Sequence, residues 1–177
     1  DTILPPGRAA RRRIIWLGLN LLTAVIAALA INIFQDTISK AFYLAVLMPI
    51  VASMGGVAAT QTLSIVLRGL TLEQITKSNL GWLFKRELAV SILNGIALSL
   101  LIGFATFLWF QNSILSILIS VAMVINLISS VIAGVFVPII LRKLKYDPAI
   151  AGSVLVTTIT DVVGFVSFLG LAAVFLL

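Results

Sequence analysis

The segment VLVTTITDVVGFVSFLGLAAVFLL (154–177) decides the fold, because a long apolar run contains a single charged side chain, that of Asp161. About 20 apolar residues are enough for a helix to cross the hydrocarbon core of a bilayer. A soluble protein would keep this carboxylate at its surface. The segment therefore predicts a transmembrane helix, and the role of Asp161 depends on what that helix faces.

The composition of the whole chain agrees with a membrane setting. Of its 177 residues, 61% are hydrophobic and 10% are charged, and the mean hydropathy is +1.22. Soluble domains average about 45–50% apolar and about 25% charged residues. The net charge of +6 comes from basic clusters that alternate with membrane-length apolar stretches, which argues against a nucleic-acid partner. The sequence predicts an all-α, polytopic membrane protein.

Five apolar stretches are long enough to be transmembrane helices, at about 14–34, 41–67, 88–110, 114–141 and 149–177. Residues 1–13 are expected to form a cytoplasmic basic arm or linker, and residues 14–177 a five-helix transmembrane domain that conducts ions. In the connection 68–87, Thr71 followed by Glu73 and Gln74 predicts the capped start of a short interfacial helix.

Polar residues near the ends of the spans are expected to have structural roles. Glu87 is predicted to cap the third span, and Asp147-Pro148 is a start signal for the fifth. Within the spans, Asn20, Asn94 and Asn126 are predicted to form hydrogen bonds between helices.

Basic residues mark one side of the membrane. All twelve lysines and arginines except Lys40 lie in the N-terminal arm or in the connections 68–87 and 142–148. Cytoplasmic connections carry an excess of such residues. We therefore expect a multi-pass protein of the plasma membrane, with a cytoplasmic N-terminus and, after five spans, an extracytoplasmic C-terminus.

Asp161 is the first candidate for a functional residue. At about 1.5 Å per residue it lies about 20 Å above Pro148, near the middle of the bilayer. Charged groups at that depth are costly and mark functional sites by default. Ser153, Thr157, Asp161, Gly164 and Phe168 share one helical stripe, with Thr158 on its flank. No basic residue lies in a predicted span to pair with Asp161, although a protonated carboxyl bonded between helices remains an alternative.

The second span contains PIVASMGGVAATQTLS (49–64), which combines a proline, a Gly-Gly pair and several hydroxyl side chains. Ser53, Gly56, Thr60 and Ser64 fall on one helical face. Such a backbone is tolerated at membrane depth where it lines a cavity. Tight helix packing through small residues explains the same pattern equally well.

The residue types favour ion transport over catalysis. One buried carboxylate with hydroxyl groups, and no histidine or cysteine, is poor equipment for an enzyme. Mg²⁺ keeps several of its waters and binds through one or two carboxylates. A two-fold homodimer brings two Asp161 side chains to one axis, where they repel each other unless a divalent ion neutralises them.

Three stretches resemble the transmembrane domain of the MgtE magnesium channels: residues 49–64 quoted above, KRELAVSILNG (85–95) and DPAIAGSVLVTTITDVVGF (147–165). The resemblance extends over all five spans. It implies a homodimer with its pore between the second and fifth spans of both subunits, and hydrated Mg²⁺ bound by Asp161 as the transported ion. It also implies cytoplasmic N and CBS domains that precede the unit and gate it, which these 177 residues do not include.

We expect the pore to be lined by Ser53, Gly55, Gly56, Val57, Thr60, Ser153, Thr157, Thr158 and Gly164. The family motif resembles MGGNxGxQ, whereas this chain has MGGVAATQ, so Val57 replaces an amide and Ala59 a glycine. This departure predicts weaker selectivity for Mg²⁺. Two other hypotheses stay open: a carrier that couples a divalent cation to Na⁺ or H⁺, and a non-conducting membrane scaffold.

Overall fold

A computed structural model describes residues 3–177, and all of the regular secondary structure in this range is helical. The helices are α1 (Pro6–Ile33), α2 (Gln35–Lys40), α3 (Tyr43–Thr71), α4 (Leu80–Phe110), α5 (Ser113–Lys143) and α6 (Ile150–Phe175). All of these except α2 are long and apolar enough to cross a membrane. The prediction of an all-α chain with five membrane spans is confirmed.

The helices extend further than the apolar stretches from which they were predicted. α1 begins at Pro6, so most of the predicted arm continues the first span as helix; proline suits a first turn because its missing N–H needs no partner there. α6 begins as predicted: the carboxylate of Asp147 accepts a hydrogen bond from the backbone N–H of Ala149 at 2.9 Å.

Two predictions about the connection 68–87 are wrong. No separate helix starts at Thr71, because α3 continues to that residue and the chain then turns through Glu73, whose φ is 56°. Glu87 does not cap α4, because the helix begins at Leu80 and Glu87 lies buried within it. The physical reason is the same for both: α3 continues beyond the last residue of its apolar stretch, and α4 begins before the first residue of its own.

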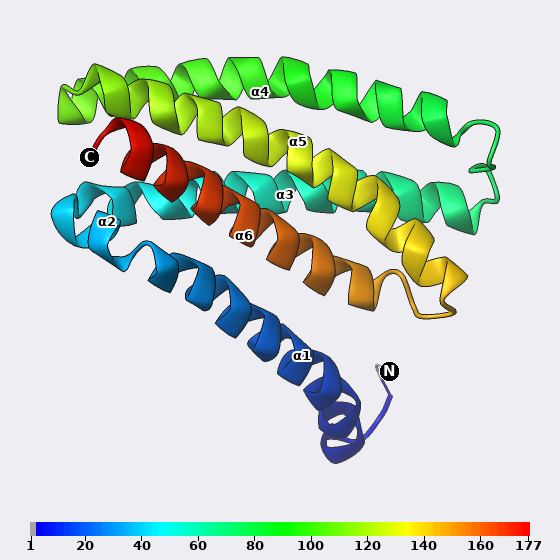
Figure 1. Ribbon diagram of the computed structural model, residues 1–177. Helices are drawn as coiled ribbons and strands as arrows, with labels where there is room; N and C mark the ends of the chain where they lie inside the picture. Colours follow the sequence, from blue (N-terminus) through cyan, green and yellow to red (C-terminus); the bar gives the residue numbers. More distant parts are fainter. Residues whose placement is uncertain (1–2) are drawn as a thin grey trace.

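α5 is the central helix of the bundle and packs against α3, α4 and α6. In Figure 1 these four helices lie alongside one another, whereas α1 lies against α6 and diverges from the bundle toward its N-terminus. The largest core cluster includes Leu44, Leu47, Leu115, Ile119 and Phe168. The core therefore joins the first turns of α3 and α5 to the last turns of α6.

A repeat of small and polar residues holds α4 against α5. The buried side of α4 consists of Glu87, Ser91, Gly95, Ser99, Gly103 and Thr106. Small residues at four-residue spacing let two helices approach closely. The Ser91 hydroxyl donates to the Leu127 carbonyl on α5 at 2.8 Å, and the Ser120 hydroxyl of α5 donates to the Ser99 carbonyl at 2.9 Å. Polar contacts thus supplement the apolar packing between these helices.

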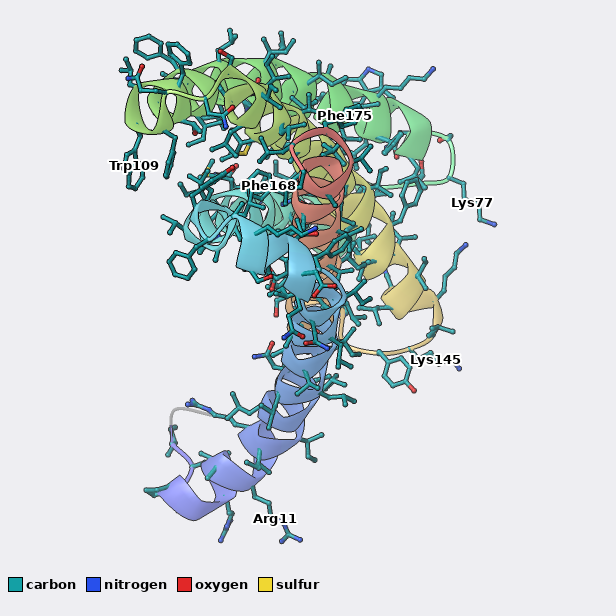
Figure 2. All side chains as sticks on the ribbon, turned by 60° about the vertical axis from the view of Figure 1, so that its left-hand side comes forward. Arg11, Lys77, Trp109, Lys145, Phe168 and Phe175 are labelled. Carbon is teal, nitrogen blue, oxygen red and sulfur yellow. The ribbon has the colours of Figure 1, made fainter. Side chains whose placement is uncertain are left out.

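The basic residues gather at one end of the bundle. In Figure 1 the N-terminus, the α3–α4 connection and the α5–α6 connection all lie at the right, while α2, which ends in Lys40, lies at the left. Figure 2 shows Arg11, Lys77 and Lys145 projecting outward. Arg142 ties this end together by donating to the Leu70 carbonyl of α3 at 3.2 Å.

Candidate functional site

Two neighbouring helices, α3 and α6, expose hydroxyl side chains next to the contacts that join them. Gly152 of α6 lies against Leu63 of α3, and Gly164 lies against Ala52. The residues that follow in sequence, Ser153, Ser64 and Ser53, are exposed. We call these three residues together with Gly56, Thr60, Thr157 and Asp161 the polar face. It runs along the outside of the α3–α6 pair within the predicted membrane spans.

Four of the five hydroxyls of the polar face, those of Thr60, Ser64, Ser153 and Thr157, donate hydrogen bonds to their own helices. Thr60 donates to the Gly56 carbonyl at 2.9 Å and Ser64 to the Thr60 carbonyl at 2.8 Å. On α6, Thr157 donates to the Ser153 carbonyl at 2.7 Å. Since these four hydroxyl protons are used in this way, their oxygens present only acceptor lone pairs outward. Such oxygens suit the water hydrogens of a hydrated cation.

Asp161 is half-buried on α6, one turn beyond Thr157. No ion pair found among residues 3–177 involves it. The same residues contain no group of three acidic, histidine or cysteine side chains that could hold a metal ion. The polar face therefore offers a single carboxylate rather than a complete ligand set for a dehydrated ion.

Asn126 of α5 fixes the helices behind the polar face. Its side chain is fully buried, and Nδ2 donates to the Val51 carbonyl of α3 at 2.8 Å. The Ser129 hydroxyl donates a hydrogen bond to Oδ1 of Asn126 at 3.1 Å. The prediction that Asn126 forms an interhelical hydrogen bond is confirmed.

Two of the predicted pore-lining glycines are buried inside the helical bundle. A β-carbon at position 164 would lie 2.9 Å from Nδ2 of Asn126, and one at position 55 would lie closer still to the same amide. Gly55 and Gly164 thus make room for Asn126 where α3, α5 and α6 meet. Phe168, on the predicted stripe of Asp161, is fully buried in the core. The stripe turns inward above Asp161.

The other predicted residues occupy the surface or its edge. Gly56 is half-buried and has open space on its side-chain side. Val57 is 53% exposed and lines a cavity between α3 and α4, and Thr158 is half-buried beside Thr157. Ser153 and Thr157 also line a cavity of about 830 Å³ that α6 forms with the start of α1, where Trp16 and Asn20 contribute.

α3 remains helical through Pro49 and the Gly-Gly pair. The second span is therefore not broken, and the two sides of α3 differ. Gly55 serves close packing, whereas Ser53 and Thr60 are exposed.

These features define a multi-pass helical membrane protein in which one exposed polar face carries a lone carboxylate. The chain belongs to the MgtE family: the family model, described as a divalent cation transporter, matches residues 48–171. This confirms the resemblance found in the sequence.

Three curated relatives carry the same name. The magnesium transporter MgtE of Bacillus subtilis is 37% identical over 95% of this chain and 37% of its own length. The magnesium transporter MgtE of Enterococcus faecalis is 29% identical over 97% of this chain and 38% of its own length. The magnesium transporter MgtE of Thermus thermophilus is 26% identical over 93% of this chain and 36% of its own length. The chain thus spans little more than a third of these curated relatives.

Proposed function

We propose that this chain forms the ion pathway of a divalent-cation channel or transporter, with Mg²⁺ as the transported ion. The observation that carries the proposal is the half-buried Asp161 carboxylate, which lies within an apolar, membrane-length helix beside exposed hydroxyl side chains such as that of Thr157. Membership of a family of divalent cation transporters and the names of the three relatives support the choice of ion.

A homodimer would complete the pathway. A carboxylate facing lipid near the bilayer centre is costly, so the polar face of a single protomer needs to be covered or hydrated. Two-fold symmetry places the same surface of both subunits against each other. In this arrangement α3 and α6 of each subunit enclose the pathway, and two Asp161 carboxylates meet at the axis.

The chemistry of the face suits an ion that keeps its water. Mg²⁺ dehydrates reluctantly and binds through one or two carboxylates while retaining several waters. Two Asp161 side chains would balance its charge, and the oxygens of Ser153, Thr157 and Thr60 would accept hydrogen bonds from its waters. Gly56 leaves space beside them, and Val57 and Thr158 border the pathway. Gly55 and Gly164 act one layer behind, by positioning α3 and α6.

The orientation follows from the position of the basic residues. Because they gather at the end that holds the N-terminus and the α3–α4 and α5–α6 connections, this end would face the cytoplasm. Any cytoplasmic domains that regulate the pathway would act at the same end.

Ion flux through the purified chain tests the proposal. The 177-residue chain is reconstituted in liposomes that contain a Mg²⁺-sensitive dye, with no gradient of Na⁺ or H⁺, and Mg²⁺ is added outside. We expect the Mg²⁺-dependent change in dye fluorescence to exceed that of empty liposomes. The fluxes of Co²⁺, Ca²⁺ and Na⁺ are measured separately for comparison. Flux that requires a Na⁺ or H⁺ gradient would indicate a coupled carrier. No flux from correctly folded dimers would indicate a scaffold subunit and overturn the proposal.

A further inference from the structure

A groove runs along the bundle between α3 and α4, with α5 as its floor. Within residues 3–177, α4 packs along α5 but makes no extended contact with α3. The space between them holds three successive cavities of about 270, 300 and 370 Å³. The first two share Ile65, and the last two share Met54 and Leu98. We call this series the α3–α4 groove. It is separate from the polar face of α3 and α6.

The cavity at the basic end has the character of an anion site. Arg68 from α3 and Arg86 from α4 both line it, together with Gln74 and Trp82, and no acidic side chain does. Arg86 lies over the Trp82 ring, with its guanidinium carbon 6.0 Å from the ring centroid. Guanidinium groups bind phosphate through paired hydrogen bonds, and tryptophan favours the level of lipid headgroups.

The loop that closes this cavity is held in shape by its own hydrogen bonds. The Gln74 N–H donates to the Gly69 carbonyl at 2.8 Å, and the Asn79 amide donates to the Gln74 carbonyl at 2.6 Å. The Asn79 side-chain oxygen accepts from the Thr76 N–H at 2.8 Å. The cavity is therefore formed before any ligand arrives, which distinguishes it from arginines merely scattered at a membrane surface.

Polarity falls along the groove in the order of a phospholipid. Beyond the arginines, the middle cavity is lined mainly by apolar residues, with the polar side chains of Gln61, Glu87 and Asn94 among them. At about 1.5 Å per residue, Gln61 lies about 10 Å along α3 from Arg68. Further along, the third cavity is lined only by apolar residues, from Ile50 to Met123.

Glu87 is the one acidic side chain in the groove, and it does not cancel the positive end. Its carboxylate is buried and lies 3.8 Å from the Arg86 guanidinium, whose side chain is 56% exposed. Arg86 can therefore reach outward to a phosphate while Glu87 faces the middle cavity. The connection 68–87 as a whole carries four basic and two acidic residues.

The geometry points to an anionic phospholipid as the occupant of the α3–α4 groove. Its phosphate lies between Arg68 and Arg86, and an acyl chain lies along the groove toward the apolar third cavity. Ala58 is about 15 Å from Arg68 along the helix, close to half the thickness of the hydrocarbon core. One leaflet's lipid thus fills the groove as far as Ala58 and Met54.

Lipid binding to the purified chain tests this assignment. Fluorescent phosphatidylglycerol is titrated into detergent-solubilised protein, with phosphatidylcholine of the same chain length as the comparison. We expect tighter binding of phosphatidylglycerol to the unaltered chain. The double variant Arg68→Gln/Arg86→Gln should weaken it about tenfold or more, because each arginine adds its own attraction to the phosphate. The double variant Lys143→Gln/Lys145→Gln removes the same charge from the same end, outside the groove, and should bind like the unaltered chain.

A second variant changes the shape of the groove without its charge. Ala58→Leu narrows the middle cavity and should reduce phosphatidylglycerol binding while both arginines remain. Equal losses in the two charge variants, or equal binding of the two lipids, would overturn the assignment. A second copy of the chain seated in the groove would instead trap a disulfide-linked dimer of Leu98→Cys in membranes, and that outcome would also overturn it.

Discussion

Asn126 of α5 donates a hydrogen bond from Nδ2 to the backbone oxygen of Val51 on α3, at a distance of 2.8 Å. The amide lies between Gly55 and Gly164, so a single buried side chain sets the separation of three helices. Because Gly56 follows Gly55 directly and Asp161 lies three residues, about one helical turn, before Gly164, the same contact sets the positions of the polar face on α3 and α6. The stability of this junction and ion transport should therefore be linked.

The Asn126 junction predicts different effects for two adjacent glycines. Gly55→Ala should lower the melting temperature, because its methyl group overlaps the Asn126 amide, and overpacking a core typically costs about 1–3 kcal/mol. Gly56→Ala should have little effect or stabilise slightly, because no atom lies within 4 Å of its β-carbon and alanine favours helix. Thermal unfolding of the two variants in detergent measures the difference.

A double variant checks the cause of that difference. In an Asn126→Ala background the amide is gone, so Gly55→Ala should lose most of its penalty. Equal melting temperatures for Gly55→Ala and Gly56→Ala, or a penalty that persists without the amide, would contradict the assigned contact.

Asp161→Asn tests the proposed cation site. The change keeps the size of the side chain and removes its charge, so Mg²⁺ flux should fall at least about tenfold, which corresponds to about 1.4 kcal/mol. Folding should survive, because Asp161 is only half-buried and makes no ion pair among residues 3–177. Asp36→Asn is the matched control, since Asp36 is an exposed acid on α2 at the opposite end from the basic clusters. Normal flux through Asp161→Asn would show that the pathway lies elsewhere.

The sequence predicted the membrane spans well because apolar length is a property of one helix alone. It could not separate Gly55 from Gly56, because neighbouring residues on a helix point about 100° apart and only the bundle decides which of them faces inward. The same limit explains Phe168. The residue continues the stripe of Asp161, but its end of α6 packs against the core between α3 and α5.

Glu87 shows a second limit. Its position after Lys85 and Arg86 resembled a helix start, but helices do not have to begin where a hydrophobic stretch begins. A signal was nonetheless present: Ser91, Gly95, Ser99 and Gly103 follow Glu87 at four-residue intervals and mark the buried side of α4. This repeat of small residues indicates the packing of α4 better than apolarity does, because the helix is apolar on nearly all sides.

Cysteine crosslinking tests the proposed homodimer. Thr157 is exposed on the polar face, so Thr157→Cys should form a disulfide across the two-fold axis in membranes. The native chain contains no cysteine, which removes any background reaction. Gly164→Cys, although it lies nearby on α6, should not crosslink, because position 164 is buried against Asn126. Gel electrophoresis without reducing agent separates the outcomes, and an exclusively monomeric Thr157→Cys would contradict a shared axis at the polar face.

Val57→Asn tests where the ion pathway ends on α3. Val57 is 53% exposed and lies between the polar face and the cavity beside α4. It stands at the position of the asparagine in the motif MGGNxGxQ. Selectivity for hydrated Mg²⁺ depends on polar groups around the ion's water shell, because divalent ions differ little in charge. An amide here should therefore raise the preference for Mg²⁺ over Ca²⁺ in competition flux. Thr60→Val, which removes an exposed hydroxyl from the middle of the polar face, should lower it. If Val57→Asn leaves selectivity unchanged while Thr60→Val alters it, position 57 belongs to the α3–α4 groove alone, and the pathway is confined to the side of α3 next to α6.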